Sequence, residues 1–222
     1  MKKVFLEIAC FNEESAIKAF LCGAHRIEIC EDMFVGGKTP SNATIESIIE
    51  HTGDVNRMVM IHKLGTSYNY TKRDFQWMLD RIGDLNEMDL HGYVFGAVNE
   101  KNLLDKEKLQ ELVTAAEGRP CTFHRAFDSI ENKSEALEEL IELGFKRVLT
   151  SGGEGRAIDN AQVLADLNKQ AAGRIIILAG GGVRSVHAKV LIQKTGVFEI
   201  HSSAILKGEL VDEEEVKRLL KN

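Results

Sequence analysis

Two glutamates lie inside short apolar segments, where an ionised side chain is costly to bury. Glu7 interrupts the run Phe-Leu-Glu-Ile-Ala, and Glu28 interrupts the run Arg-Ile-Glu-Ile-Cys. Successive strand side chains point to opposite faces, so both carboxylates point away from the face that their apolar neighbours cover. A buried carboxylate is tolerated when it is paired. Two interpretations follow: structural ion pairs with internal Arg or Lys, or catalytic groups that move protons.

Three histidines end or directly follow apolar segments, at His62, His124 and His201. Neutral histidine near pH 7 suits proton transfer or metal ligation. A lone histidine is usually structural, but three of them at strand ends favour one shared site. We therefore predict Glu7, Glu28 and His124 as catalytic residues, and His201 as a substrate contact.

Polar and glycine-rich segments near these histidines could bind an anion. Arg125 directly follows His124, Asp128 comes three residues later, and glycines occupy 180–182. Backbone N–H groups at a helix start attract phosphate or carboxylate. Another glycine-rich stretch spans 152–155, and simple tight turning is the alternative explanation for both stretches. The residues predicted to bind a small anionic ligand are Arg125, Asp128, Gly181, Gly182, His201, Ser202 and Ser203.

Cys10 and Cys30 end two apolar segments that follow one another along the chain. Adjacent strands lie about 4.8 Å apart, so the two sulfurs could meet. Two converging thiolates suit a soft ion such as Cu(I) or zinc. The chain lacks a CxxC pair or a four-ligand set, which disfavours structural zinc. Buried inert thiols are the alternative, and Cys22 and Cys121 are interpreted as core residues.

The elements that must position these residues alternate in type. Apolar segments of strand length recur, rich in Val, Ile, Phe and Leu and mostly without polar alternation, as in strands buried on both faces. They span 4–9, 26–30, 57–62, 93–97, 121–124, 147–150, 175–179 and 197–201. Stretches with helical spacing lie between them, at 12–22, 43–51, 71–86, 105–117, 134–143, 157–171, 185–194 and 212–221.

Seven glycines precede the second to eighth strand segments, where helix ends favour a positive φ. They are Gly23, Gly53, Gly92, Gly118, Gly144, Gly173 and Gly196, about 29 residues apart on average. A ~250-residue (β/α)8 barrel gives about 31 residues per unit. We predict a single (β/α)8 TIM barrel domain over 1–222 rather than an open doubly wound sheet. Its site should lie where strands end and βα loops begin.

Composition excludes several classes of partner. The 222 residues carry a formal net charge of -6, which attracts neither nucleic acid nor an anionic membrane surface. No apolar run approaches the ~20 residues of a membrane span. Glu7 interrupts the first apolar run before it could act as a signal peptide. We expect a cytoplasmic protein with reduced cysteines.

Seven sequence motifs, taken together, resemble those of a known family. They are LEI with Cys10, RIEIC at 26–30, GGKTPS at 36–41, TFHRAFD at 122–128, RVLTSG at 147–152, GGGV at 180–183 and HSSA at 201–204. In this order, over nearly the whole chain, they resemble the CutC family of copper homeostasis proteins. The resemblance implies a (β/α)8 barrel, a cytoplasmic location and a homo-oligomer. It also implies Cu(I) binding through cysteines that look like Cys10 and Cys30.

One departure from the family pattern concerns the third strand segment. The family usually shows Ile-Arg-Pro-Arg-Gly-Gly there, whereas this chain reads Ile-His-Lys-Leu-Gly-Thr over 61–66, followed by Tyr68 and Tyr70. Arginine is a rigid bidentate anion clamp that neither His nor Leu replaces. Arg125 is then the first cation expected in the anion pocket, and Lys63 the second.

Three hypotheses account for this sequence. A copper homeostasis protein needs Cys10 and Cys30 alone and leaves the other polar residues unexplained. A TIM-barrel enzyme of isomerase or lyase type, acting on a small phosphorylated or carboxylated metabolite, uses the convergent titratable groups. A barrel kept as an interaction scaffold would have a mouth filled by side chains.

Overall fold

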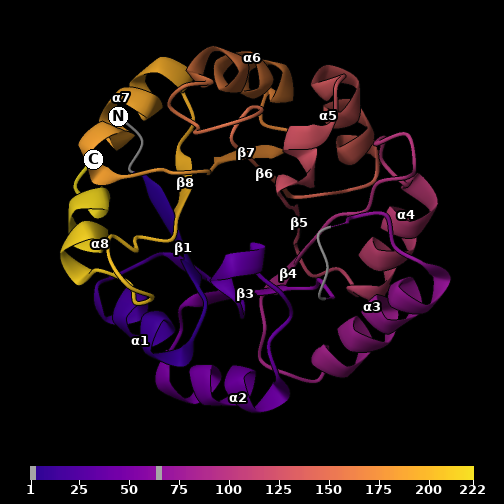
Figure 1. The fold of residues 1–222 in the computed structure, drawn as a ribbon, viewed down its shortest axis with the longest axis horizontal. Helices are drawn as coiled ribbons and strands as arrows, with labels where there is room; N and C mark the ends of the chain where they lie inside the picture. The colour runs from indigo at the N-terminus through magenta and orange to yellow at the C-terminus, as the bar shows by residue number, and fades with distance from the viewer. Residues whose placement is uncertain (1–3, 64–66) are drawn as a thin grey trace.

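The chain folds as a closed ring of eight parallel strands, seen end-on in Figure 1. The computed structural model describes residues 4–63 and 67–222. Each strand pairs with the next along the chain, and the last strand pairs with the first, with Phe5 opposite Glu199. The strands are β1 (Phe5–Cys10), β2 (Arg26–Ile29), β3 (Asn56–Met60), β4 (Gly92–Phe95), β5 (Cys121–Phe123), β6 (Arg147–Thr150), β7 (Ile176–Ala179) and β8 (Glu199–Ser202).

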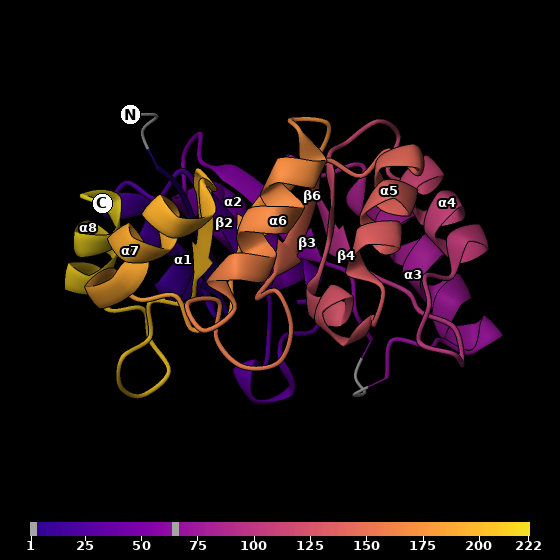
Figure 2. The same cartoon turned by 90° about the horizontal axis from the view of Figure 1, so that it is seen from above.

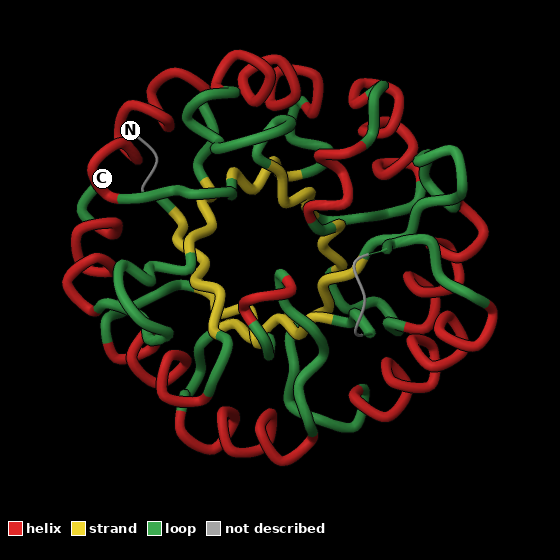
Figure 3. The backbone as a smooth tube through the Cα atoms, viewed as in Figure 1, coloured by secondary structure: helices red, strands yellow, loops and turns green. Residues whose placement is uncertain are grey.

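An α-helix follows each strand in the described chain, and these helices form an outer ring (Figure 3). The predicted (β/α)8 barrel is therefore confirmed, and the pairing of the first and last strands excludes an open sheet. The helices are α1 (Glu13–Leu21), α2 (Asn42–His51), α3 (Lys72–Leu85), α4 (Lys106–Ala115), α5 (Lys133–Glu142), α6 (Ala161–Ala171), α7 (Ser185–Thr195) and α8 (Glu213–Leu220).

Loops that leave the carboxyl ends of the strands gather at one edge of the barrel. In the side view of Figure 2, the violet segment η1 (Met33–Val35) and the yellow loop between β8 and α8 both extend from the lower edge. A second short 3-10 helix, η2 (Arg125–Ser129), follows β5 directly. Most of the predicted site residues lie in the last residues of the strands or directly after them, toward this same edge.

Polar side chains fix where the helices begin. Ser41 is the N-cap of α2, and its hydroxyl accepts a hydrogen bond from the Thr44 N–H at 3.1 Å. Asn12 caps α1 in the same way, accepting from the Ser15 N–H at 2.8 Å. Each cap satisfies a backbone donor that the helix itself leaves without a partner.

Six of the seven predicted glycines have the positive φ expected at a helix end, and Gly92 does not. Gly92 begins β4 instead, where a Cβ would lie 2.1 Å from the carbonyl oxygen of Pro120. Glycine is required there because the backbone approaches closely, and the prediction of a helix cap was wrong at this position.

The inner face of the barrel carries buried charge. Arg26 pairs with Glu7 and lies 2.5 Å from Glu199, and all three side chains are buried. Arg147 donates to the Thr122 hydroxyl at 2.9 Å from the opposite side of the interior. The large apolar core therefore lies mainly between the strands and the helices, and the barrel interior combines these charged residues with a small apolar cluster around Met58.

Replacing Gly92 by Ala should destabilise the protein by about 1–3 kcal/mol, because its Cβ would meet the Pro120 carbonyl. Gly83→Ala is the control: Gly83 lies within α3, and an alanine Cβ there would have no neighbour within 4 Å, so alanine should be neutral or stabilise by ~0.5–1 kcal/mol. Urea unfolding measures both. Equal effects at the two positions would contradict the close approach.

Candidate active site

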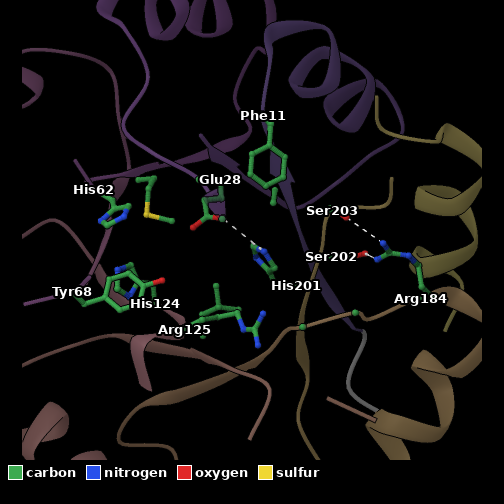
Figure 4. Close-up of a pocket in the computed structure, with 17 residues that line it drawn as sticks. Phe11, Glu28, His62, Tyr68, His124, Arg125, Arg184, His201, Ser202 and Ser203 are labelled. Atoms are coloured by element: carbon green, nitrogen blue, oxygen red, sulfur yellow. Dashed lines mark hydrogen bonds and ion pairs between the residues drawn. The ribbon is translucent and has the colours of Figure 1, made fainter. Parts of the chain in front are cut away.

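A cavity of about 260 Å³ opens at the carboxyl ends of the strands (Figure 4). Eight of the residues predicted from sequence line it: Glu28, His124, Arg125, Gly181, Gly182, His201, Ser202 and Ser203. The other four predicted residues, Glu7, Cys10, Cys30 and Asp128, lie outside its lining. The cavity shows that the mouth is not filled by side chains.

Glu28 extends from β2 into this cavity, with 2 % of the residue exposed. Its Oε2 lies 3.7 Å from His201 Nε2, and its Oε1 has no hydrogen-bond partner among the described residues. Burial raises the pKa of Glu28 to about 7; the charge of Glu7 adds to this shift and His201 opposes it. A carboxyl group with such a pKa can both accept and release a proton near neutrality.

Glu7 orients His201 from below the cavity. Its Oε1 lies 2.6 Å from His201 Nδ1, and its Oε2 pairs with Arg26. Although burial opposes ionisation, Arg26 and His201 hold the pKa of Glu7 well below its usual range. Burial lowers the pKa of His201, but the hydrogen bond to Glu7 and the charge of Glu28 raise it overall. Glu7, predicted as catalytic, therefore lies outside the cavity lining and contacts it through His201.

His124 presents a buried hydrogen-bond donor to the same cavity. Its Nδ1 accepts from the Ala126 N–H at 3.3 Å, which assigns the proton of the neutral ring to Nε2. Burial, and secondarily the neighbouring His62, lowers the pKa of His124 to about 3. Nε2 has no partner among the described residues. Gly96 makes room for the ring, since a Cβ there would lie 2.7 Å from Nδ1.

Two aromatic neighbours of His124 also line the cavity: Tyr68, which was not assigned to the site from sequence, and His62, one of the three histidines predicted to share a site. The ring of Tyr68 lies 4.4 Å from that of His124, centroid to centroid, and burial raises the pKa of Tyr68. His62, which also lines the cavity, bonds through Nδ1 to the Tyr70 hydroxyl at 2.7 Å. These side chains pack around His124 and restrict its rotation.

Arg125 reaches the cavity while paired on one side. Its Nε donates to Asp128 at 2.8 Å and one Nη donates to the Ser151 hydroxyl at 3.1 Å, with 45 % of the side chain exposed. Asp128 also accepts from the Ser151 N–H at 3.0 Å. Asp128 therefore holds Arg125 and the loop after β6 in place, and Arg125 faces the ligand space.

Arg184 is a second cation in the cavity that the sequence analysis missed. It donates to the hydroxyls of Ser202 at 3.1 Å and Ser203 at 3.3 Å. No carboxylate within the described ranges pairs with it. The sequence feature that could have indicated Arg184 is its position as a basic residue directly after the glycines and valine at 180–183, where α7 begins.

Lys63, the other predicted cation, points elsewhere. Its Nζ lies 2.7 Å from Asp74, and it lines a separate surface groove rather than the cavity. Leu64, Gly65 and Thr66, which complete the departure from the family pattern after β3, lie outside the described residues. Arg125 and Arg184 are thus the cations of the cavity lining, within the part of the chain that is described.

The two glycine-rich stretches differ in role. Gly181 lines the cavity with a φ of 97°, and a Cβ there would lie 2.7 Å from Ser151 Cβ. Gly182 follows with a φ of 67°. Consecutive residues in this conformation expose backbone toward the ligand space. Gly152 packs instead against Asn160, outside the cavity lining, which fits a tight turn.

The two cysteines proposed as copper ligands pack on different sides of the sheet. Cys10 belongs to the large apolar core between strands and helices, and its thiol donates to the Ile8 carbonyl at 3.4 Å. Cys30 belongs to a small cluster inside the barrel with Met58 and Met60. Burial raises the pKa of both thiols. The described residues also contain no group of three or more His, Cys, Asp or Glu suited to a metal.

The closed ring defines a TIM-barrel protein, and its polar cavity lies at the carboxyl ends of the strands, where this fold places ligand sites. The CutC family model matches residues 4–206, and the chain belongs to the CutC family.

Similar proteins match this chain over nearly its whole length. A CutC family protein of Treponema denticola is 36% identical, covering 94% of this chain and 85% of its own. The copper homeostasis protein cutC homolog of Mus musculus is 36% identical, covering 90% and 73%. A crystal structure described as a copper homeostasis protein CutC of Streptococcus agalactiae is 29% identical, with a TM-score of 0.84 over 90% of this chain and 98% of its own.

The pKa of Glu28 makes folding stability depend on pH. Folding raises this pKa from 4.5 to about 7, so the folded protein holds the proton more tightly and stability falls as pH rises through this range. Glutamine resembles the neutral carboxyl. Glu28→Gln should therefore match the parent at pH 5 and exceed it by about 1–3 kcal/mol at pH 8 in urea unfolding.

The control for this experiment is Glu46→Gln, an exposed position on α2, which should change stability little at either pH. A Glu28→Gln protein that is less stable than the parent at pH 8 would show that the ionised carboxylate is well accommodated in the fold.

Proposed function

We propose that this CutC-family barrel is an enzyme that transfers protons on a small anionic metabolite, as in isomerase or lyase chemistry. The proposal is carried by Glu28 Oε1 and His124 Nε2, two buried polar atoms without partners among the described residues, in side chains that line one cavity. Leaving a buried polar atom unpaired costs about 1–3 kcal/mol. Such atoms persist where a ligand completes their hydrogen bonds.

The anionic part of the substrate is assigned to the other wall of the cavity. Arg184, Arg125 and the backbone at Gly181 and Gly182 face the ligand space there, together with the Ser203 hydroxyl. Hydrogen bonds between ionised groups in a partly dry pocket contribute about 1.5–3 kcal/mol each. A phosphate or carboxylate held by these donors would leave the rest of the molecule between Glu28 and His124.

A proton-transfer enzyme exchanges substrate hydrogen with solvent. In D2O, proton NMR of a panel of small phosphorylated and carboxylated carbonyl compounds should show loss of a C–H signal beside the carbonyl. Glu28→Gln should slow this exchange about 10²–10⁴-fold, because the base is removed. Glu46→Gln should leave the rate unchanged. Absence of exchange in every compound of the panel would overturn the proposal.

Copper binding is a separate hypothesis, supported by the names of relatives and by the thiols themselves. It predicts that replacing Cys10 and Cys30 together by Ser abolishes tight Cu(I) binding, because serine lacks a soft donor. The Cys22→Ser, Cys121→Ser double variant should retain binding. Competition with a chromophoric Cu(I) chelator measures both, and equal loss in the two proteins would mean adventitious thiol binding.

The expected cytoplasmic location and homo-oligomeric state stay predictions. No helix among the described residues has the length and apolarity needed to cross a bilayer. Ultracentrifugation of the purified chain measures the oligomeric state.

A further inference from the structure

The two unpartnered atoms of the cavity can form hydrogen bonds with different groups of a substrate. His124 Nε2 carries a proton, since Nδ1 accepts from Ala126, so it requires an acceptor such as a carbonyl oxygen. Glu28 Oε1 is a carboxyl oxygen that requires a proton donor or an acidic C–H. Glu28 extends from β2 and His124 from the end of β5, so the two face one ligand from different walls (Figure 4).

The electrons of a broken C–H or C–C bond need an acceptor. No lysine lines the cavity within the described chain, and the three residues between 63 and 67 are Leu, Gly and Thr. Within that described lining, a Schiff base has no amine on which to form. The acceptor that these residues do provide for is the substrate carbonyl itself, with His124 donating to its oxygen as negative charge develops.

One carboxyl group lines the cavity within the described chain. Glu28 is the sole carboxylate among the described lining residues. Elimination also needs an acid at the leaving group, whereas isomerisation needs a carboxyl group and a donor to the carbonyl oxygen, which are the two groups that lack partners among the described residues. A single carboxyl group that removes a proton and returns it to the neighbouring carbon is suited to isomerisation. Triosephosphate isomerase pairs a glutamate base with a neutral histidine in this way.

The hydrogen-bond donors assigned above to the anionic part of the substrate suit a tetrahedral group better than a planar one. These donors come from different directions: Arg125 follows β5, Gly181 follows β7, and Ser203 follows β8 beside Arg184. A phosphate offers three terminal oxygens to donors on several sides, whereas a carboxylate offers two in one plane. The Nη atoms of Arg184 donate to neutral oxygens, namely the Ser202 and Ser203 hydroxyls and the carbonyls of Val183 and Ile205, and no carboxylate of the described chain pairs with it, which favours an anion nearby.

We infer that the substrate is a phosphate ester of an α-hydroxy aldehyde or ketone, and that the reaction is aldose–ketose isomerisation through an enediol. This inference rests on the proton-transfer function proposed above. Glu28 removes the proton from the hydroxyl-bearing carbon, the C–H pair forms the C=C bond, and the carbonyl π pair moves onto oxygen beside His124. Glu28 then returns the proton to the former carbonyl carbon, while the hydroxyl proton passes to the other oxygen and a new carbonyl forms. No oxidant or reductant is needed.

The experiment compares matched probes with the full chain in D2O by proton NMR. The phosphate esters are ribose 5-phosphate, glucose 6-phosphate and dihydroxyacetone phosphate; ribose, glucose and dihydroxyacetone are their unphosphorylated partners, and pyruvate and 2-oxoglutarate represent carboxylates. The expected result is conversion of at least one phosphate ester to its isomer with deuterium at the carbon that gains the proton. His124→Ala should slow conversion about 10²–10³-fold, because a donor to the developing oxyanion is lost.

Arg184 supplies the test of the phosphate assignment. Arg184→Gln should raise KM for the phosphate ester roughly 10- to 100-fold, the cost of losing a charge-assisted hydrogen bond, with a smaller change in kcat. Arg174→Gln, which removes a surface pair with Glu138, is the matched control. 2-Phosphoglycolate combines a phosphate with a planar carboxylate that resembles an enediolate. Its affinity, measured by calorimetry, should weaken in Arg184→Gln and His124→Ala and persist in Arg174→Gln.

The outcomes separate this inference from the proposed function. Exchange in pyruvate or 2-oxoglutarate without turnover of any phosphate ester would overturn the substrate class and leave proton transfer standing. Cleavage of a phosphate ester in place of isomerisation would overturn the reaction assigned here and support a lyase. No exchange in any probe, with no binding of 2-phosphoglycolate, would overturn both.

Discussion

The structure of the site depends on one buried ion pair network, in which Arg26 lies between Glu7 and Glu199 inside the barrel. Taking three charges out of water is costly, and the network is tolerated because its members pair with one another. The cross-strand register that places Glu7 directly opposite Arg26 makes this pairing possible. Removing one member of such a buried pair costs about 3–5 kcal/mol, since its partner stays charged and unpaired.

The orientation of His201 and the surroundings of Glu28 depend on this network. Because Arg26 keeps Glu7 ionised, Glu7 can hold Nδ1 of His201, and His201 is turned with Nε2 toward Glu28. Glu28 is left with one oxygen lacking any partner in the described chain, and burial without full pairing raises its pKa. Two glutamates on neighbouring strands thus acquire opposite protonation preferences from their surroundings, as acid–base sites require. The extensive apolar core between strands and helices supplies stability that offsets the unpaired groups.

Sequence patterns predicted most of the fold and part of the site. The alternation of apolar runs and helical stretches predicted the barrel, and strand periodicity correctly pointed Glu7 and Glu28 to the inner face. It could not separate their roles, because these depend on the register between β1 and β2, which brings Arg26 to Glu7 and not to Glu28. Gly92 shows the same limit: a helix cap and a close backbone approach both require glycine, and only the packing of β4 on β5 distinguishes them.

Arg184 could not be assigned from the strand ends, since it precedes a helix and donates to Ser202, the last residue of β8, and to Ser203 directly after it. Its position bears on the departure from the family pattern after β3, where the arginines are absent and Lys63 pairs with Asp74. The cations of the described mouth therefore come from the loops after β5 and β7, while Phe11 and Met60 line the wall formed by β1 and β3. In the function proposed above, this asymmetry would orient the substrate, with its charged end toward Arg184 and its uncharged end toward Glu28 and His124, which have unpartnered atoms among the described residues.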